Sequence, residues 1–133
     1  MTESGTVVRI VSWAFRLLAA AILGQTLFFK FTGAPEAVYI FSTLGVEPWG
    51  RIATGLLEAV AVVLLLHPRT PALGALLACA LMAGAIVSHL TRLGIEVQGD
   101  GGLLFKLALT TMAAGLVVLL LHRRELPVVG GWF

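Results

Sequence analysis

The sequence predicts an all-α fold: an integral membrane four-helix transmembrane bundle with a short interfacial helix between the first and second spans. The first observation is composition, since 59% of the 133 residues are hydrophobic and 12% are charged, against roughly 45–50% and 25% in soluble domains. The second is a mean hydropathy of +1.00, more apolar surface than so small a globule can bury. The third is the division of this apolar sequence into four long segments.

Each apolar segment approaches the roughly 20 residues that a membrane-spanning helix needs. We expect spans at about residues 10–30, 51–67, 72–93 and 103–122, in a single membrane domain over residues 1–133. The second span is short unless Trp49 and Arg51 lie at the membrane interface, which their residue types favour. Arg9 and the apolar stretch after it also allow a cleaved signal peptide, but continued apolarity to Phe31 favours a retained helix.

The connections between the segments indicate how the helices are arranged. Residues 67–71 form a tight polar turn with two prolines, so the second and third spans are expected to be antiparallel neighbours. Residues 94–102 are a glycine-rich loop. The longest connection has Pro35 near its start and Gly45 near its end, which predicts a short helix lying on the bilayer or capping the bundle.

Several function classes are excluded by what the sequence lacks. One cysteine, Cys79, cannot form an internal disulfide or a CxxC pair. A formal net charge of +2 does not indicate a nucleic-acid partner. The signatures of phosphate-binding loops, dinucleotide folds, zinc proteases and serine hydrolases do not occur. No metal ligand set is evident, and haem is not expected because His67 and His122 lie at the other membrane level from His89.

Polar residues from all four spans fall in the same half of the membrane. An antiparallel bundle brings the end of the first span, the start of the second, the end of the third and the start of the fourth to one side. Glu58 lies seven residues beyond Arg51, about 10 Å deeper in the bilayer, where a carboxylate is costly unless it is paired or protonated. The candidate ligand-binding or proton-handling residues are Gln25, Lys30, Arg51, Glu58, His89 and Lys106.

These side chains favour an internal polar pocket, in which Glu58 pairs with Lys30 or Lys106. Structural roles explain the same residues: a salt bridge between helices for Glu58, snorkelling for the lysines and a packing hydrogen bond for His89. Gln25 has the alternative of a hydrogen bond across helices.

Two further features predict structural roles rather than chemistry. Arg16 and Arg51 are each expected to anchor the chain at lipid headgroups. Small residues repeat at four-residue spacing in two runs, Ala20 with Gly24 and Ala80 with Gly84 and Ser88. Such runs are typical of helices that approach closely.

Four segments carry a resemblance to a known family. They are Phe28–Gly33 after the first span, Gly55–Glu58 in the second, the turn Pro68–Arg69, and Met82–His89 in the third. In order and spacing they resemble the DoxX-like family of small bacterial membrane proteins over about residues 10–122. Lys30, Glu58 and His89 occupy the positions where the family pattern carries polar residues.

The resemblance implies a redox-associated membrane subunit, because the family is named for a small subunit of a quinol oxidase. Other members are associated with oxidative stress or quinone stress. The implied ligand is a quinone or another small lipophile, with Glu58 handling a proton and His89 bonding a ligand carbonyl or relaying that proton. Electrons would come from a redox protein partner, so a catalytic role is expected for a complex rather than for this chain alone.

Two other functions fit the same residues. A membrane scaffold or assembly factor would use the polar cluster only to fix helix packing. A small proton-coupled transporter, working as a homo-oligomer, would use Glu58 to carry the proton. Co-purification of a stable protein partner that survives mutation of the pocket would favour the scaffold. Proton-coupled flux abolished by Glu58→Gln would favour the transporter.

The basic residues give a weak orientation signal. Five of them flank one side of the predicted bundle and four flank the other, which favours cytoplasmic termini. The first side carries Arg9, Arg16, Arg69, Arg123 and Arg124, and the second carries Lys30, Arg51, Arg92 and Lys106. Together with the family resemblance, this predicts residence in a bacterial cytoplasmic membrane.

Overall fold

The structure, a computed structural model, describes residues 3–125, all of whose regular elements are helical. The elements are α1 (Glu3–Thr32), α2 (Pro35–Thr43), α3 (Trp49–Leu66), α4 (Pro71–Ser88), a π-helical turn η1 (His89–Leu93), α5 (Leu103–Leu121) and a 3-10 turn η2 (Arg123–Glu125). Four of the helical segments are long and apolar enough to cross a membrane, one for each expected span. The predicted fold class is therefore confirmed.

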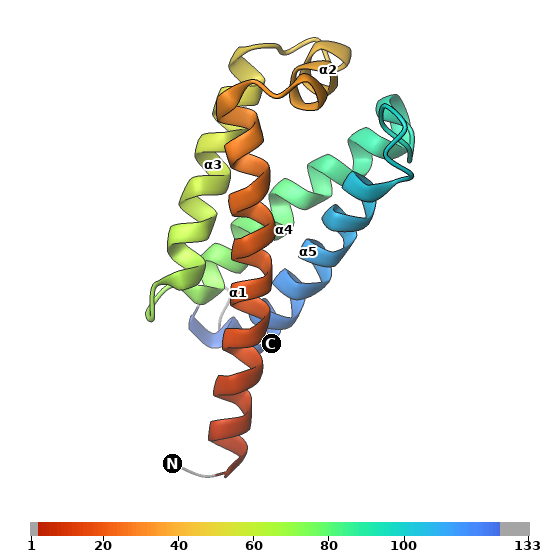
Figure 1. The fold of residues 1–133 in the computed structure, drawn as a ribbon. Coiled ribbons are helices and arrows are strands. Elements are labelled where there is room, and N and C mark those ends of the chain that lie inside the picture. The colour runs from red at the N-terminus through yellow and green to blue at the C-terminus, as the bar shows by residue number, and fades with distance from the viewer. Residues whose placement is uncertain (1–2, 126–133) are drawn as a thin grey trace.

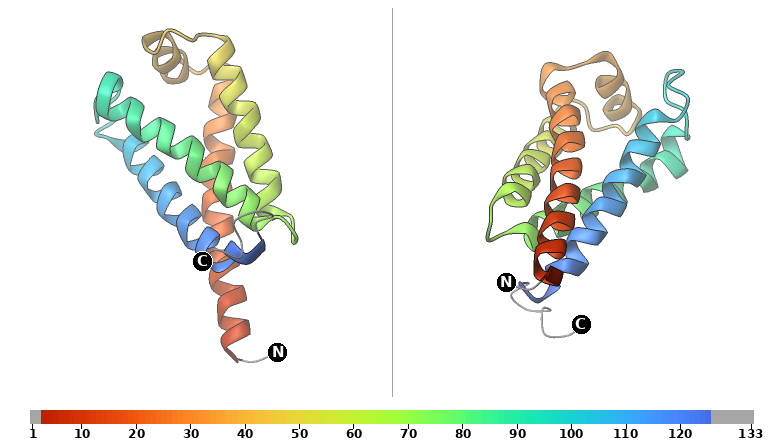
Figure 2. Two further views of the ribbon diagram at one scale, coloured as in Figure 1. Left: turned by 180° about the vertical axis from the view of Figure 1, so that it is seen from behind. Right: turned by 60° about the horizontal axis from the view of Figure 1, so that its bottom comes forward.

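The long helices form an up-and-down bundle in which chain neighbours pack side by side. The main contacts run from α1 to α3, from α3 to α4, from α4 to α5, and from α5 back to α1, so the four helices close into a ring. Figure 1 shows the α4–α5 pair leaning away from the α1–α3 pair toward the end where α2 lies, and the rear view in Figure 2 agrees. The bundle therefore has a closed end and an open end.

The closed end comprises the N-terminal half of α1, the turn at residues 67–70 and the end of α5. Here the helices touch backbone to backbone. A Cβ added to Gly74 of α4 would lie 2.5 Å from the Leu65 nitrogen of α3. On the other side of α4, a Cβ added to Gly115 of α5 would lie 2.9 Å from Cys79 Sγ. Small residues thus allow α3, α4 and α5 to pack closely at this end.

Arginines from α1 and α3 bind the end of each other's helix. Arg16, 3% exposed, donates to the Leu65 carbonyl at 2.6 Å and the His67 carbonyl at 3.0 Å, where α3 ends. Arg51 of α3 donates to the Lys30 carbonyl in the last turn of α1 and pairs with Glu47 at 2.8 Å. Cations favour helix C-termini because the last carbonyls lack helical partners and carry partial negative charge. The headgroup-anchor prediction for Arg16 is wrong, because α3 ends within reach of its buried guanidinium.

The open end comprises the end of α1, α2, the start of α3, η1 and the loop at residues 94–102. The small-residue runs do not bring helices together here. A Cβ added to Gly84, or to Gly24, would meet no atom within 4 Å. Ala80, Gly84 and Ser88 instead line a cavity, so the prediction of close approach is wrong for this run. The reason is that α4 has already diverged from α1 at this level (Figure 1).

The short helix α2 forms as predicted, and it closes one side of the open end. Pro35 begins it, where a missing N–H costs nothing, and Gly45 follows it at φ +79°, a conformation that favours glycine. Ala37 and Phe41 are its buried residues. Phe41, and Leu44 just after the helix, line the cavity, so α2 caps the bundle.

Candidate ligand site

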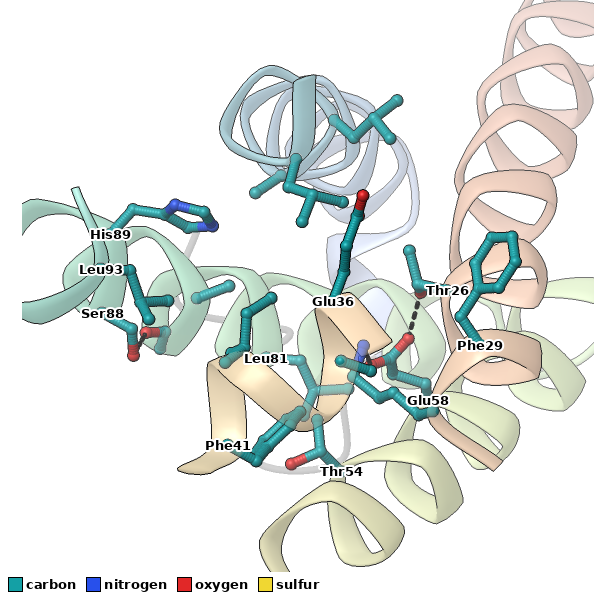
Figure 3. A pocket seen from close by; sticks show the side chains of 18 of the residues that line it. Thr26, Phe29, Glu36, Phe41, Thr54, Glu58, Leu81, Ser88, His89 and Leu93 are labelled. Atoms are coloured by element: carbon teal, nitrogen blue, oxygen red, sulfur yellow. Dashed lines mark hydrogen bonds and ion pairs between the residues drawn. The ribbon is translucent and has the colours of Figure 1, made fainter. Parts of the chain in front are cut away.

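A large cavity lies at the open end, between the two leaning helix pairs and under α2. It has a volume of about 760 Å³, within the usual range of pockets for small ligands, roughly 300–1,000 Å³. Leucine, isoleucine, alanine and phenylalanine side chains make most of its wall, and all four long helices and α2 contribute to it. Its polar residues are in the minority and come from several elements, among them Thr26 of α1, Glu36 of α2 and Glu58 of α3 (Figure 3).

A buried ion pair between α1 and α3 forms one wall of the cavity. Lys30 Nζ lies 2.7 Å from Glu58 Oε1, with the two side chains 17% and 1% exposed. The Thr26 hydroxyl, also on α1, donates to Glu58 Oε2. Both oxygens of the carboxylate therefore have partners, which satisfies the requirement for burying a charge inside a bilayer.

His89 lies on the opposite wall, at the start of the π-helical turn that ends the third span. Its side chain is buried, and Figure 3 shows the ring pointing toward the middle of the cavity. Its Nδ1 lies 3.0 Å from the Gly94 carbonyl oxygen, and its ring stands edge-on to Phe105 with centroids 5.6 Å apart. π-turns often occur at functional sites because they change the direction of side chains in an otherwise regular helix.

Three of the expected site residues do not reach the cavity. Gln25 is exposed, since its neighbour Thr26 takes the inward face of α1. Lys106 is exposed on α5, where Leu104, Leu107 and Ala108 face the cavity instead. Arg51 is held by Glu47 and by the end of α1. Of the two lysines expected as partners of Glu58, the ion pair is made by Lys30.

Five polar residues that line the cavity were not among the site residues predicted from the sequence: Thr26, Glu36, Thr54, Ser88 and Gln98. Thr26 precedes Lys30 by four residues, so the i, i+4 spacing places both on one helix face and contained a usable signal. Glu36 of α2 also lines the cavity. Its position there follows from the way α2 folds over the bundle, which the local sequence does not indicate. Within residues 3–125, no group of three or more histidine, cysteine, aspartate or glutamate side chains is placed to hold a metal ion.

Behind His89, the loop at residues 94–102 is held in shape by Asp100. Its Oδ1 accepts from the backbone N–H of Val97 at 3.0 Å and Gly102 at 2.8 Å, and its Oδ2 from Leu104 at 3.2 Å. Burial alone would raise the pKa of Asp100, but these three N–H groups and nearby His89 together lower the pKa below its ordinary value. The loop therefore carries a fixed negative charge at the start of α5.

Fold and cavity together define a small integral membrane protein, a four-helix bundle with an internal pocket at one end. The family model described as the DoxX-like family matches residues 14–121, most of the chain. The chain belongs to the DoxX-like family, as the four segments identified in the sequence predicted. Comparison with curated proteins and with solved structures gave no significant match.

Proposed function

We propose that this protein binds a small lipophilic ligand of the quinone class in the open-end cavity, as a redox-associated membrane subunit. The observation that carries the proposal is an apolar cavity of about 760 Å³ with a buried lysine–glutamate pair in its wall. Such a cavity suits a molecule with an apolar body and one or two oxygen atoms. A site of this kind, mostly apolar with a few convergent polar groups, is typical of small-molecule sites.

Each member of the polar wall has a role in the proposal. Lys30 uses one N–H on Glu58 and has further donors for a ligand oxygen. Glu58 exchanges a proton with that oxygen when the ligand changes its redox state, while Thr26 holds the carboxylate in place. Electrons come from a redox protein partner in the same membrane.

The test is native mass spectrometry of gently extracted protein, with decylubiquinone as the probe. Glu58→Gln keeps the shape of the side chain but removes its charge and the ion pair. We expect this variant to bind the probe about tenfold more weakly, the effect of losing a charge-assisted hydrogen bond network. Glu47→Gln is the matched control, because Glu47 also pairs with a cation at the open end but does not line the cavity.

Equal probe binding by the wild type and Glu58→Gln would contradict the role of the ion pair. A wild-type protein that binds no probe and no cellular lipophile, and that carries only a protein partner, would contradict the proposed function. That result would favour a scaffold in which the ion pair only joins α1 to α3.

A further inference from the structure

The hydrogen bond of His89 fixes which ring nitrogen carries a proton. A backbone carbonyl only accepts hydrogen bonds, so Nδ1, 3.0 Å from the Gly94 oxygen, has to be the donor. In the neutral ring Nε2 is then an acceptor with a free lone pair. Donating to a ligand carbonyl, the role expected from the sequence, would require a second proton on this ring.

The acceptor Nε2 has no hydrogen-bond partner among the described residues. It is also not among the fully buried atoms that lack a partner, and His89 lines the cavity, so a ligand in the cavity can reach it. A ligand hydroxyl that reaches Nε2 gains a hydrogen bond that a carbonyl or ether oxygen, which has no proton to donate, cannot make. Phe105 packs edge-on against the ring and Gly94 holds Nδ1, so the direction of Nε2 is set before any ligand arrives. Because the ring is already held in place, little conformational entropy is lost when a ligand donor binds to Nε2.

The wall of α4 next to His89 leaves room for a flat group. Ala80, Gly84 and Ser88 line the cavity along this stretch, and none extends far beyond Cβ. The Ser88 hydroxyl is turned back to the Gly84 carbonyl at 2.8 Å. A ring lying against this wall would have His89 at one side and the Lys30–Glu58 pair across the cavity. Figure 3 shows His89 and Glu58 on different sides of it.

We propose that the cavity selects the hydroxyl-bearing form of its ligand, a phenol or hydroquinone, over the form with only carbonyl or ether oxygens. His89 Nε2 accepts the hydrogen bond from the ligand hydroxyl, an interaction that a carbonyl or ether oxygen cannot make. Lys30, on the facing wall, is a donor and does not discriminate between a hydroxyl and a carbonyl oxygen. This inference rests on the proposed function, because it uses the same cavity.

The test compares two probes of nearly the same shape, 4-nonylphenol and 4-nonylanisole, of which only the phenol has a donor. Binding is measured by titration calorimetry of the full chain in lipid nanodiscs, with empty nanodiscs as the blank. We expect the wild type to bind the phenol about five- to tenfold more tightly, as one net hydrogen bond predicts. His89→Phe keeps an aromatic ring beside Phe105 but lacks the acceptor, so it is expected to bind both probes as the wild type binds the anisole.

His67→Phe serves as the matched control, because His67 is exposed in the turn at the closed end; it should keep the preference for the phenol. Equal binding of both probes by the wild type, or a preference that survives in His89→Phe, would overturn this inference and leave the proposed function standing. Failure of the wild type to bind either probe or decylubiquinone would overturn both. Retained anisole binding in His89→Phe shows that the variant is folded.

Discussion

The two ends of this bundle use similar small residues for opposite purposes. At the closed end, Gly74 and Gly115 lie where a Cβ would collide with the neighbouring helix. At the open end, Gly84 of the same helix α4 faces empty space, and the ion pair and His89 line the same space. The comparison teaches that a small residue in a membrane helix permits close packing but does not by itself produce it.

The ends also differ in what their polar groups do. The buried Arg16 binds the carbonyls that end α3, and Ser12 Oγ lies 2.7 Å from His122 Nε2, so these polar groups hold helices together. At the open end Lys30 and Glu58 pair with each other, yet both still face the cavity. The closed end therefore holds the helices together through direct contacts, and the open end contains the cavity.

The largest expected effect is a difference in stability between alanine substitutions at two glycines of α4. Gly74→Ala places a methyl group 2.5 Å from the Leu65 nitrogen and 2.9 Å from the Leu64 carbonyl carbon, so α3 and α4 have to move apart. We expect a loss of about 1–3 kcal/mol in the free energy of unfolding. Gly84→Ala meets no atom within 4 Å and gains helix propensity, so it should be neutral or stabilising by up to about 1 kcal/mol.

Reversible unfolding of both variants in the same detergent measures this difference. A Gly84→Ala variant as unstable as Gly74→Ala would show that the open end is closely packed, and the comparison between the ends would fail.

A smaller effect is expected from acid, and only at the open end. Because the folded-state pKa of Asp100 is below its ordinary value of 3.8, the charged carboxylate stabilises the fold at neutral pH. This contribution is lost as the pH falls through the ordinary value toward the folded-state pKa. Asp100→Asn should lower the free energy of unfolding by about 1 kcal/mol at pH 7, as loss of a helix cap does. The difference in unfolding free energy between the variant and the wild type should become smaller in acid.

Amide hydrogen exchange at Val97, Gly102 and Leu104 is the local measurement, because their N–H groups donate to Asp100. Amides near the buried Arg16 at the closed end serve as the reference. If the difference in amide protection between the wild type and Asp100→Asn stayed constant from pH 7 to pH 3, the charge-based explanation would be contradicted.

The sequence was sufficient for the fold because the signals were long. Four apolar segments, the proline turn at residues 67–71 and the interval from Pro35 to Gly45 predicted every long helix and α2. The pairing of Glu58 with a lysine at the same membrane level also followed from an antiparallel topology alone.

It was harder to predict which face of each helix points toward the inside of the bundle. Spans α4 and α5 are apolar nearly all round, so periodicity says little about which side faces inward. As a result Lys106 and Gln25 were expected in the pocket although both are exposed. The rotation of a helix is set by packing, as at Gly74 and Gly115, and no local pattern encodes it. The π-turn that aims His89 depends in the same way on the loop that supplies the Gly94 carbonyl.

The most direct test of the central claim is to fill the cavity and measure binding. Gly84→Leu would place a large side chain in the space along α4, whereas Gly24→Leu adds the same side chain to a glycine of α1 that does not line the cavity. With decylubiquinone titrated into both variants in nanodiscs, we predict at least tenfold weaker binding for Gly84→Leu and wild-type binding for Gly24→Leu. Binding by Gly84→Leu equal to that of the wild type would contradict the account, because the probe would then occupy some place other than the open end of this bundle.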